Sequence, residues 1–254
     1  MRLLPILPLL LAATAALAEA PNPPAPKLNP GEALVVCDDG GKVSAFGDDK
    51  TEHPMGSLAQ LVWLKMAGAD WSGLEVYYVC SDPACQAPKG HGRVDMKKAL
   101  HEDCDAAFLY WANWVREDWV RIEGEGLTRM KTIDSFGPFL GERFKGDGPM
   151  PQYGPEWIGR GELLRASPSS FMAWWKDDQN SDVRTRVREL LGGFFHGVLD
   201  RKTWWFKAAA SSAGTWALGS DGHITALLYL PVPETATTAT DRLKTLMGLP
   251  VKKK

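Results

Sequence analysis

The sequence lacks several features that would assign it to a common functional class. Basic residues are not in excess, because 29 Lys and Arg stand against 31 Asp and Glu and the formal net charge is −2. This balance gives no general attraction to nucleic acid. No Gly-rich phosphate loop of the Walker type occurs. After the N-terminal segment, no apolar run approaches the roughly 20 residues that a membrane-spanning helix needs. We therefore predict no nucleic-acid partner and no transmembrane segment in the mature chain.

The N-terminus has the pattern of a cleaved signal peptide. Arg2 supplies a short positive region, residues 3–11 form an apolar stretch, and Ala16-Leu17-Ala18 is a small-x-small cleavage site. The apolar stretch is too short to cross about 30 Å of hydrocarbon. We predict a signal peptide at 1–18, a Pro-rich linker at 19–32, one domain at 33–247 and a basic tail at 248–254. The predicted location is periplasmic or otherwise secreted.

Cysteine is scarce, with four residues: Cys37, Cys80, Cys85 and Cys104. An even number of cysteines in an exported chain predicts disulfides, and three pairings are possible. The competing interpretation is a zinc site, for which we expect tight pairs such as C-x2-C. No such pair occurs, and His91 follows Cys85 at an unfavourable spacing. We therefore predict disulfide candidates, no metal site and no cofactor.

The order of elements predicts an α+β domain. Strands are expected at 33–37, 42–46, 74–80, 203–209, 214–218 and 224–230, and helices at 57–66, 95–100, 106–115, 169–175, 183–199 and 241–247. Residues 123–161 are rich in Gly and Pro and are expected to be loop. Strands at both chain ends predict one antiparallel sheet, built from an N-terminal hairpin and three C-terminal strands, with the helical middle packed on one side.

Ser57 opens a nearly all-apolar helix and follows the segment Pro54-Met55-Gly56. A helix N-terminus presents free N–H groups and positive potential, which favours an oxyanion beside the serine. The simpler interpretation is that Ser57 is an N-cap.

A second block, Gly90-His91-Gly92-Arg93-Val94-Asp95, leads into Asp103-Cys104-Asp105. Together with the Ser57 block, it resembles the transpeptidase domain of penicillin-binding proteins, in which a Gly-His-Gly segment precedes a Ser-x-Asn motif. The triplet at 103–105 takes the place of that motif, 46 residues after Ser57, an interval usual for this family and for serine β-lactamases. A third stretch, from Ala166-Ser167-Pro168 to Trp205-Phe206-Lys207, resembles the segment that ends in the family's Lys-Thr-Gly strand. The resemblance covers about residues 33–232.

All three motifs depart from the family pattern. The first motif is Ser-x-x-Lys, in which the Lys amine takes the serine proton, but here Gln60 stands at the fourth position. The second motif has lost its Ser and Asn, which leaves Asp103 and Asp105. The third keeps Lys207 and replaces Thr-Gly with Ala208 and Ala209. In the family, the Thr hydroxyl helps to bind the substrate carboxylate, and the Gly lets the substrate lie close to the strand.

The resemblance implies two alternative functions. The first is a catalytically degenerate domain with a binding or scaffold role in peptidoglycan or cell-envelope metabolism, which recognises a stem peptide, a β-lactam or an envelope protein. The second is an active serine acyl enzyme, a D-Ala-D-Ala carboxypeptidase, transpeptidase or β-lactamase, in which Asp103 or Lys207 replaces the missing base of Ser57. A third interpretation, sugar binding, comes from the 11 Trp residues, although core packing also explains aromatic pairs such as Trp174-Trp175.

Overall fold

The computed structural model describes residues 25–67, 77–81, 85, 87, 89–111, 138–139, 159, 161–162, 164–192, 194–195, 198–199 and 204–251. The predicted signal peptide, nearly all of the predicted loop at 123–161 and the last three lysines lie outside these residues. The predicted domain bounds and the predicted location therefore stay predictions. Among the described helices, none combines the length and the apolar character needed to cross a membrane.

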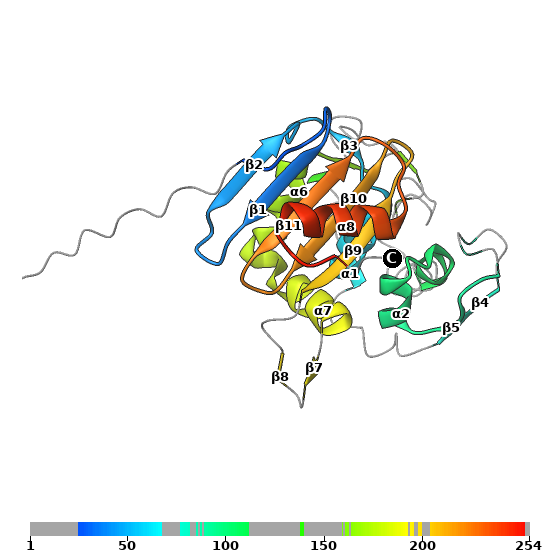
Figure 1. Cartoon of the computed structure of the whole chain (residues 1–254). Coiled ribbons are helices and arrows are strands. Elements are labelled where there is room, and N and C mark those ends of the chain that lie inside the picture. The colour runs from blue at the N-terminus through cyan, green and yellow to red at the C-terminus, as the bar shows by residue number, and fades with distance from the viewer. Residues whose placement is uncertain are drawn as a thin grey trace, which may run out of the picture.

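A five-stranded antiparallel sheet forms the centre of the molecule, in the order β2-β1-β11-β10-β9 (Figure 1). Its strands are β1 (Ala33–Cys37), β2 (Val43–Gly47), β9 (Trp205–Ala210), β10 (Thr215–Ser220) and β11 (Thr225–Leu230). The N-terminal strand β1 pairs with the C-terminal strand β11, which joins the two ends of the chain. The predicted α+β class and the predicted sheet are confirmed.

Helices cover both faces of the sheet. The main core lies on the face of α1 (Ala59–Ala67), α6 (Pro168–Lys176) and α7 (Ser181–Leu191). The other face is covered by α8 (Ala236–Leu246), whose Ala239 and Leu243 pack against Leu34 and Leu228. Figure 1 shows α8 crossing in front of β10 and β9, opposite α6. The expectation that helices pack on one side holds for the middle of the chain, while the C-terminal helix closes the second face.

Smaller elements complete the fold at its edges. They are β3 (His53–Pro54), η1 (Gly56–Leu58), β4 (Tyr78–Cys80), β5 (Gly92–Val94), α2 (Met96–His101), a helical stretch at 105–111, β6 (Arg165–Ala166), η4 (Asp178–Asn180), β7 (Phe194–Phe195) and β8 (Val198–Leu199). In Figure 1, α2, β4 and β5 lie together beyond β9, at one end of the sheet.

Two predicted helices differ from the structure at their ends. The helix predicted at 183–199 ends at Leu191, because Gly192 leaves the helical conformation and residues 194–199 include the paired strands β7 and β8. The helix predicted at 241–247 begins at Ala236, where the Thr235 side chain accepts a hydrogen bond from the Thr238 N–H. The Thr-rich first turn carries no apolar periodicity, so the sequence pattern did not reveal it.

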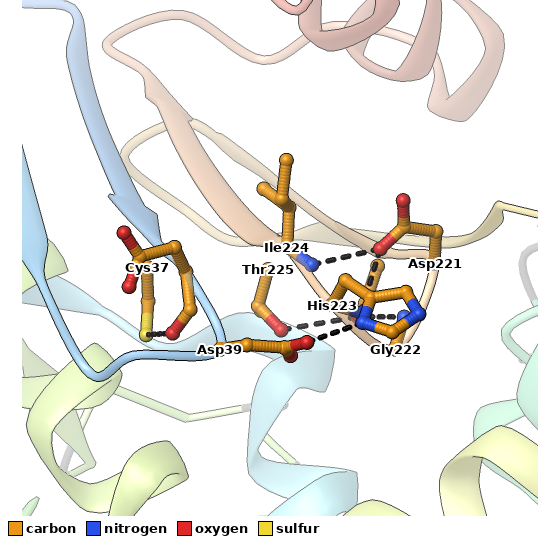
Figure 2. A network of polar contacts seen from close by, with 9 residues as sticks. Cys37, Asp39, Asp221, Gly222, His223, Ile224 and Thr225 are labelled. Carbon is orange, nitrogen blue, oxygen red and sulfur yellow. Dashed lines mark hydrogen bonds and ion pairs between the residues drawn. The ribbon is translucent and has the colours of Figure 1, made fainter. Parts of the chain in front are cut away.

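Two turns of the sheet are joined by a hydrogen bond at the surface. His223, in the turn between β10 and β11, contacts the carboxylate of Asp39, in the turn between β1 and β2 (Figure 2). The Asp221 carboxylate accepts hydrogen bonds from the N–H groups of His223 and Ile224, which fixes the first turn. The histidine and Asp39 side chains are about half exposed, so this pair contributes little to stability.

Candidate functional site

A close backbone contact positions Ser57. Gly56 has φ +53°, and a Cβ at this position would lie 1.9 Å from the carbonyl oxygen of Ala210 at the end of β9. Only glycine allows this approach at a positive φ. On the other side, the indole N–H of Trp216 donates to the carbonyl of Pro54 at 2.9 Å. The chain is thus held against the sheet immediately before Ser57.

Ser57 lies in the 3-10 turn η1, which leads into α1, and its side chain is not an N-cap. The Ser57 hydroxyl instead donates to the Asp103 carboxylate, with 2.6 Å between Oγ and Oδ2. This is the contact that the active-enzyme hypothesis expects between a serine nucleophile and a substitute base. Ser57 is 3% exposed.

Asp103 reaches Ser57 because of the way in which α2 ends. The residue has φ +56°, which places it in the left-handed region. The Cys104 N–H donates to the Ala99 carbonyl at 2.9 Å, and the Glu102 N–H donates to the Lys98 carbonyl. The second bond belongs to the last regular turn of α2, whereas the first spans the left-handed Asp103 and marks a Schellman-type helix end, whose left-handed position is usually Gly. An aspartate there directs a carboxylate toward η1.

Lys207 projects from β9 into the same site. Its ammonium donates to Asp103 Oδ1 at 3.1 Å, to Gln60 Oε1 at 3.0 Å and to the Leu100 carbonyl at 3.3 Å. The Lys207 side chain is 1% exposed and the Asp103 side chain is 16% exposed. An ammonium has three N–H donors, and here all three have protein acceptors.

Gln60 and Asp105 extend this network inward. The Gln60 side chain is fully buried, and its amide nitrogen donates to Asp105 Oδ1 at 3.1 Å. Five polar residues therefore form one connected set, which we call the Ser57 network: Ser57, Gln60, Asp103, Asp105 and Lys207. The sequence predicted each member, and the structure brings all five together.

The two alanines after Lys207 point in opposite directions, since side chains alternate along a strand. Ala209 shares the buried face of Lys207 and is 1% exposed. Ala208 lies on the α8 face and lines a cavity of roughly 600 Å³. This cavity also contacts Asp103, Phe206, Thr235 and Lys244, so it reaches the outer edge of the Ser57 network. Of the two predicted substrate-binding alanines, only Ala209 lies on the face of β9 from which Lys207 enters the Ser57 network.

A second polar cluster lies beside the Ser57 network. The sulfurs of Cys80, Cys85 and Cys104 and a ring nitrogen of His91 all lie within 4.8 Å of one another, a group that could hold a metal ion. The Cys85 sulfur lies 3.2 Å from His91 Nδ1, and the Cys80 sulfur lies 3.7 Å from it. The expectation that His91 is too poorly spaced to join these cysteines is wrong. We call these four residues the Cys80 cluster.

The thiols of the Cys80 cluster differ in pKa. Burial raises the pKa of Cys80, but hydrogen bonds from His91 and from the two neighbouring thiols outweigh burial and lower this pKa to about 7. Burial raises the pKa of both Cys85 and Cys104, and the nearby Cys80 raises them further. All four cysteines of the chain are free and buried in the structure, so the predicted disulfides are not confirmed.

The sequence contained a signal for this cluster that the C-x2-C criterion excluded. Cys80 and Cys85 are separated by four residues, which lies within the spacing that zinc-binding pairs use. A second signal was the Gly90-His91-Gly92 turn, whose two glycines allow the backbone to fold back toward Cys80. Gly90 and Gly92 have φ +66° and +64°, and a Cβ on Gly90 would lie 2.1 Å from the Cys80 carbonyl oxygen.

Of the two tryptophan pairs that suggested sugar binding, Trp174-Trp175 lies in the core, whereas in Trp204-Trp205 only Trp205 is buried and Trp204 lines the cavity beside Ala208. Trp174 and Trp175 are 8% and 2% exposed, and Trp205 is 4% exposed. Trp175 and Trp205 pack with ring centroids 6.1 Å apart. Burial of these rings favours the core-packing interpretation over a stacking surface for glycans.

Comparison with known proteins shows the fold alone. No protein-family model and no curated protein matches the chain. Among solved structures, a delta mutant of the class D β-lactamase BAT-2 matches at 13% identity with a TM-score of 0.56, over 87% of this chain and 93% of that one. A class D β-lactamase from Sebaldella termitidis matches at 9% identity and 0.54, over 85% and 88%. A β-lactamase from Burkholderia ambifaria matches at 13% and 0.50, over 87% and 94%.

Proposed function

We propose that this chain, whose fold is that of the serine β-lactamase and penicillin-binding-protein superfamily, is an exported domain that has lost acyl-transfer chemistry. It would act as a binding or scaffold domain in peptidoglycan or cell-envelope metabolism. The observation that carries the proposal is the saturation of Lys207. Its three N–H donors are engaged by Asp103, Gln60 and the Leu100 carbonyl. A substrate carboxylate would meet a cation that is already paired.

Gln60, which stands where the family has its general-base lysine, also supports the loss of acyl-transfer chemistry. Its amide oxygen accepts from Lys207 and its amide nitrogen donates to Asp105. An amide cannot take a proton near neutral pH, and this amide is held as a bridge between two charged groups. The position that carries the base in the Ser-x-x-Lys motif therefore has a structural role in this chain.

A second candidate function rests on the Ser57–Asp103 hydrogen bond. In an active acyl enzyme, Oγ of Ser57 would attack the substrate carbonyl carbon while its proton passes to Asp103 Oδ2. The C–N bond would then break as Asp103 returns this proton to the leaving nitrogen. The Lys207 ammonium, bound to the other carboxylate oxygen, would orient that base. Nucleophile, base and orienting group thus stand in the order that covalent catalysis requires.

The decisive test is acylation by a fluorescent penicillin, read by gel fluorescence and intact mass. We expect no adduct in the mature protein at high drug concentration and long incubation, with folding verified by circular dichroism. One penicilloyl group that is present in the wild type and absent from Ser57→Ala would overturn the proposal. If Asp103→Asn then slows acylation by about 10²–10⁴-fold, Asp103 is the general base.

The binding role has its own test. A peptidoglycan stem peptide ending in D-Ala-D-Ala is titrated into the protein by calorimetry, and the peptide is recovered for mass analysis. Saturable binding with an intact peptide supports a binding domain. Release of the terminal D-Ala supports the active enzyme instead. If no binding is detected, stem peptides are removed from the proposal and an envelope protein becomes the remaining ligand class.

A further inference from the structure

The Cys80 cluster gathers four potential metal ligands from four places along the chain. Cys80 ends β4, His91 directly precedes β5, and Cys104 follows α2. Cys85 comes from the connection between β4 and β5. The three cysteines are 1%, 5% and 0% exposed, in the order Cys80, Cys85 and Cys104. Three thiols and an imidazole thus converge in a site that is largely closed to solvent.

The distances in this cluster fit a tetrahedral zinc ion. Zn–S bonds of about 2.3 Å and Zn–N bonds of about 2.0 Å place two sulfurs about 3.8 Å apart, and a sulfur and a nitrogen about 3.5 Å apart. The two measured sulfur–nitrogen distances, 3.2 Å for Cys85 and 3.7 Å for Cys80, lie on either side of that value. All remaining ligand-atom separations are within 4.8 Å.

We propose that Cys80, Cys85, His91 and Cys104 bind one structural Zn²⁺. Three thiolates and one imidazole form a Cys₃His set, which is among the closed ligand sets of structural zinc sites. Soft sulfur ligands disfavour Mg²⁺ and Ca²⁺, which prefer oxygen. On binding, each of the three thiols releases its proton to solvent, so the bound site carries one net negative charge. This inference does not depend on the proposed function.

The surroundings of the cluster fit such a site. The Lys98 ammonium donates to the carbonyl of His91 at 2.8 Å, which places a cation beside a centre that becomes negative when zinc binds. Gly90 lets the chain pass directly over the Cys80 carbonyl, because a Cβ would lie 2.1 Å from that oxygen. The Gly-His-Gly turn therefore brings the imidazole back onto the first cysteine.

Zinc would also brace the Ser57 network. Cys104 lies between Asp103 and Asp105, whose side chains contact Ser57 and Gln60 respectively. A metal bond to Cys104 would fix the left-handed turn that directs Asp103. The zinc site would thus hold Asp103 and Asp105 in position beside Ser57 and Gln60, and it would take no part in catalysis.

The test compares two cysteine variants of the full mature chain. Cys85→Ser removes one proposed ligand, while Cys37→Ser removes the cysteine outside the cluster, which is also buried and whose thiol donates to the Asp38 carbonyl. Each protein is reduced, loaded with Zn²⁺ and dialysed, and its metal is counted by mass spectrometry. We expect one zinc per chain in the wild type and in Cys37→Ser. We expect Cys85→Ser to bind at least about 100-fold more weakly.

Equal zinc affinity in the two variants, or no stoichiometric zinc in the reduced wild type, would overturn the proposal. A disulfide between two cysteines of the cluster would also overturn it if reduction does not restore zinc binding. Such a disulfide is detected because the mass of the unreduced protein is lower by two hydrogen atoms. If Cys85→Ser does not fold, Co²⁺ is loaded into the wild type. Strong visible bands with thiolate charge transfer indicate a tetrahedral sulfur-rich site, and a weak octahedral spectrum contradicts it. Penicillin acylation is scored separately, so the two proposals fail independently.

Discussion

Two polar clusters share the segment 103–105, and they accommodate their buried ionisable side chains in different ways. In the Ser57 network, oppositely charged groups pair with one another, as Lys207 does with Asp103 at 3.1 Å. In the Cys80 cluster, three thiols and an imidazole lie within 4.8 Å of one another, and no ion pair between residues that the structure describes includes them. A buried charge, such as a carboxylate or a thiolate, needs either a partner or a metal. The first cluster has the partner within the protein, and the second has the geometry for a metal.

The comparison predicts that the Ser57 network is held mainly by its buried ion pair. Lys207→Met keeps an apolar chain of similar length on β9 but leaves the Asp103 carboxylate without its cation. We expect the free energy of unfolding to fall by about 3 kcal/mol, at the low end of the range for breaking a buried pair because Asp103 is partly exposed. Urea denaturation measures this change.

The matched control is the double variant Lys207→Met with Asp103→Asn, which removes both charges. Because neither charge is then left alone, we expect it to recover a large part of the lost stability. If the double variant is as unstable as the sum of the two single variants, the pair makes no coupled contribution and the network is not held in this way.

A second prediction concerns the stability that zinc binding adds to the folded chain. At free Zn²⁺ about 100 times the dissociation constant, binding should stabilise the folded chain by about 2.7 kcal/mol. A chelator should remove this gain in the wild type and in Cys37→Ser. It should lower the stability of Cys85→Ser by no more than about 0.4 kcal/mol, because a site that binds 100-fold more weakly is at most half occupied at this zinc concentration. Thermal unfolding with and without chelator measures the difference.

The same experiment in the Lys207→Met background tests whether the clusters act together. If zinc at Cys104 braces Asp103, the zinc-dependent stabilisation and the effect of Lys207→Met should not be additive, with a coupling of roughly 0.5–3 kcal/mol. If the two effects are simply additive, the two clusters are energetically independent. Zinc would then not hold Asp103 in position, although the proposed metal binding would stand.

The sheet and the Ser57 network could be predicted from sequence because their signals are local. Strand β1 has an apolar, β-branched sequence, and Asp38-Asp39-Gly40-Gly41 marks the turn to β2. The network was found through motif positions, so its members were named even where the residue types differ from the family. The geometry implied by the family resemblance then placed Asp103 near Ser57, and in the structure the two side chains are hydrogen-bonded at 2.6 Å.

The Cys80 cluster could not be assembled from sequence because its geometry depends on backbone turns. Positive φ angles at Gly90, Gly92 and Asp103 bring its pieces together, and two of these are glycines whose conformation a residue pattern does not fix. The helix predicted through residue 199 failed for a similar reason. Apolar residues continue after Leu191, but Gly192 ends the helix and the chain pairs as β7 and β8.

The smallest predicted effect isolates the turn that both clusters share. Asp103→Ala and Asp103→Gly remove the same carboxylate and leave Lys207 in the same state, so they differ only at the backbone. Alanine pays roughly 1–2 kcal/mol for the left-handed conformation, while glycine loses about 0.4–1 kcal/mol through its more flexible unfolded chain. We therefore expect Asp103→Gly to be the more stable variant by about 0.5–1 kcal/mol in urea denaturation. An alanine variant of equal or greater stability would mean that the left-handed turn at Asp103 is not maintained in solution, and the link between the two clusters would then be lost.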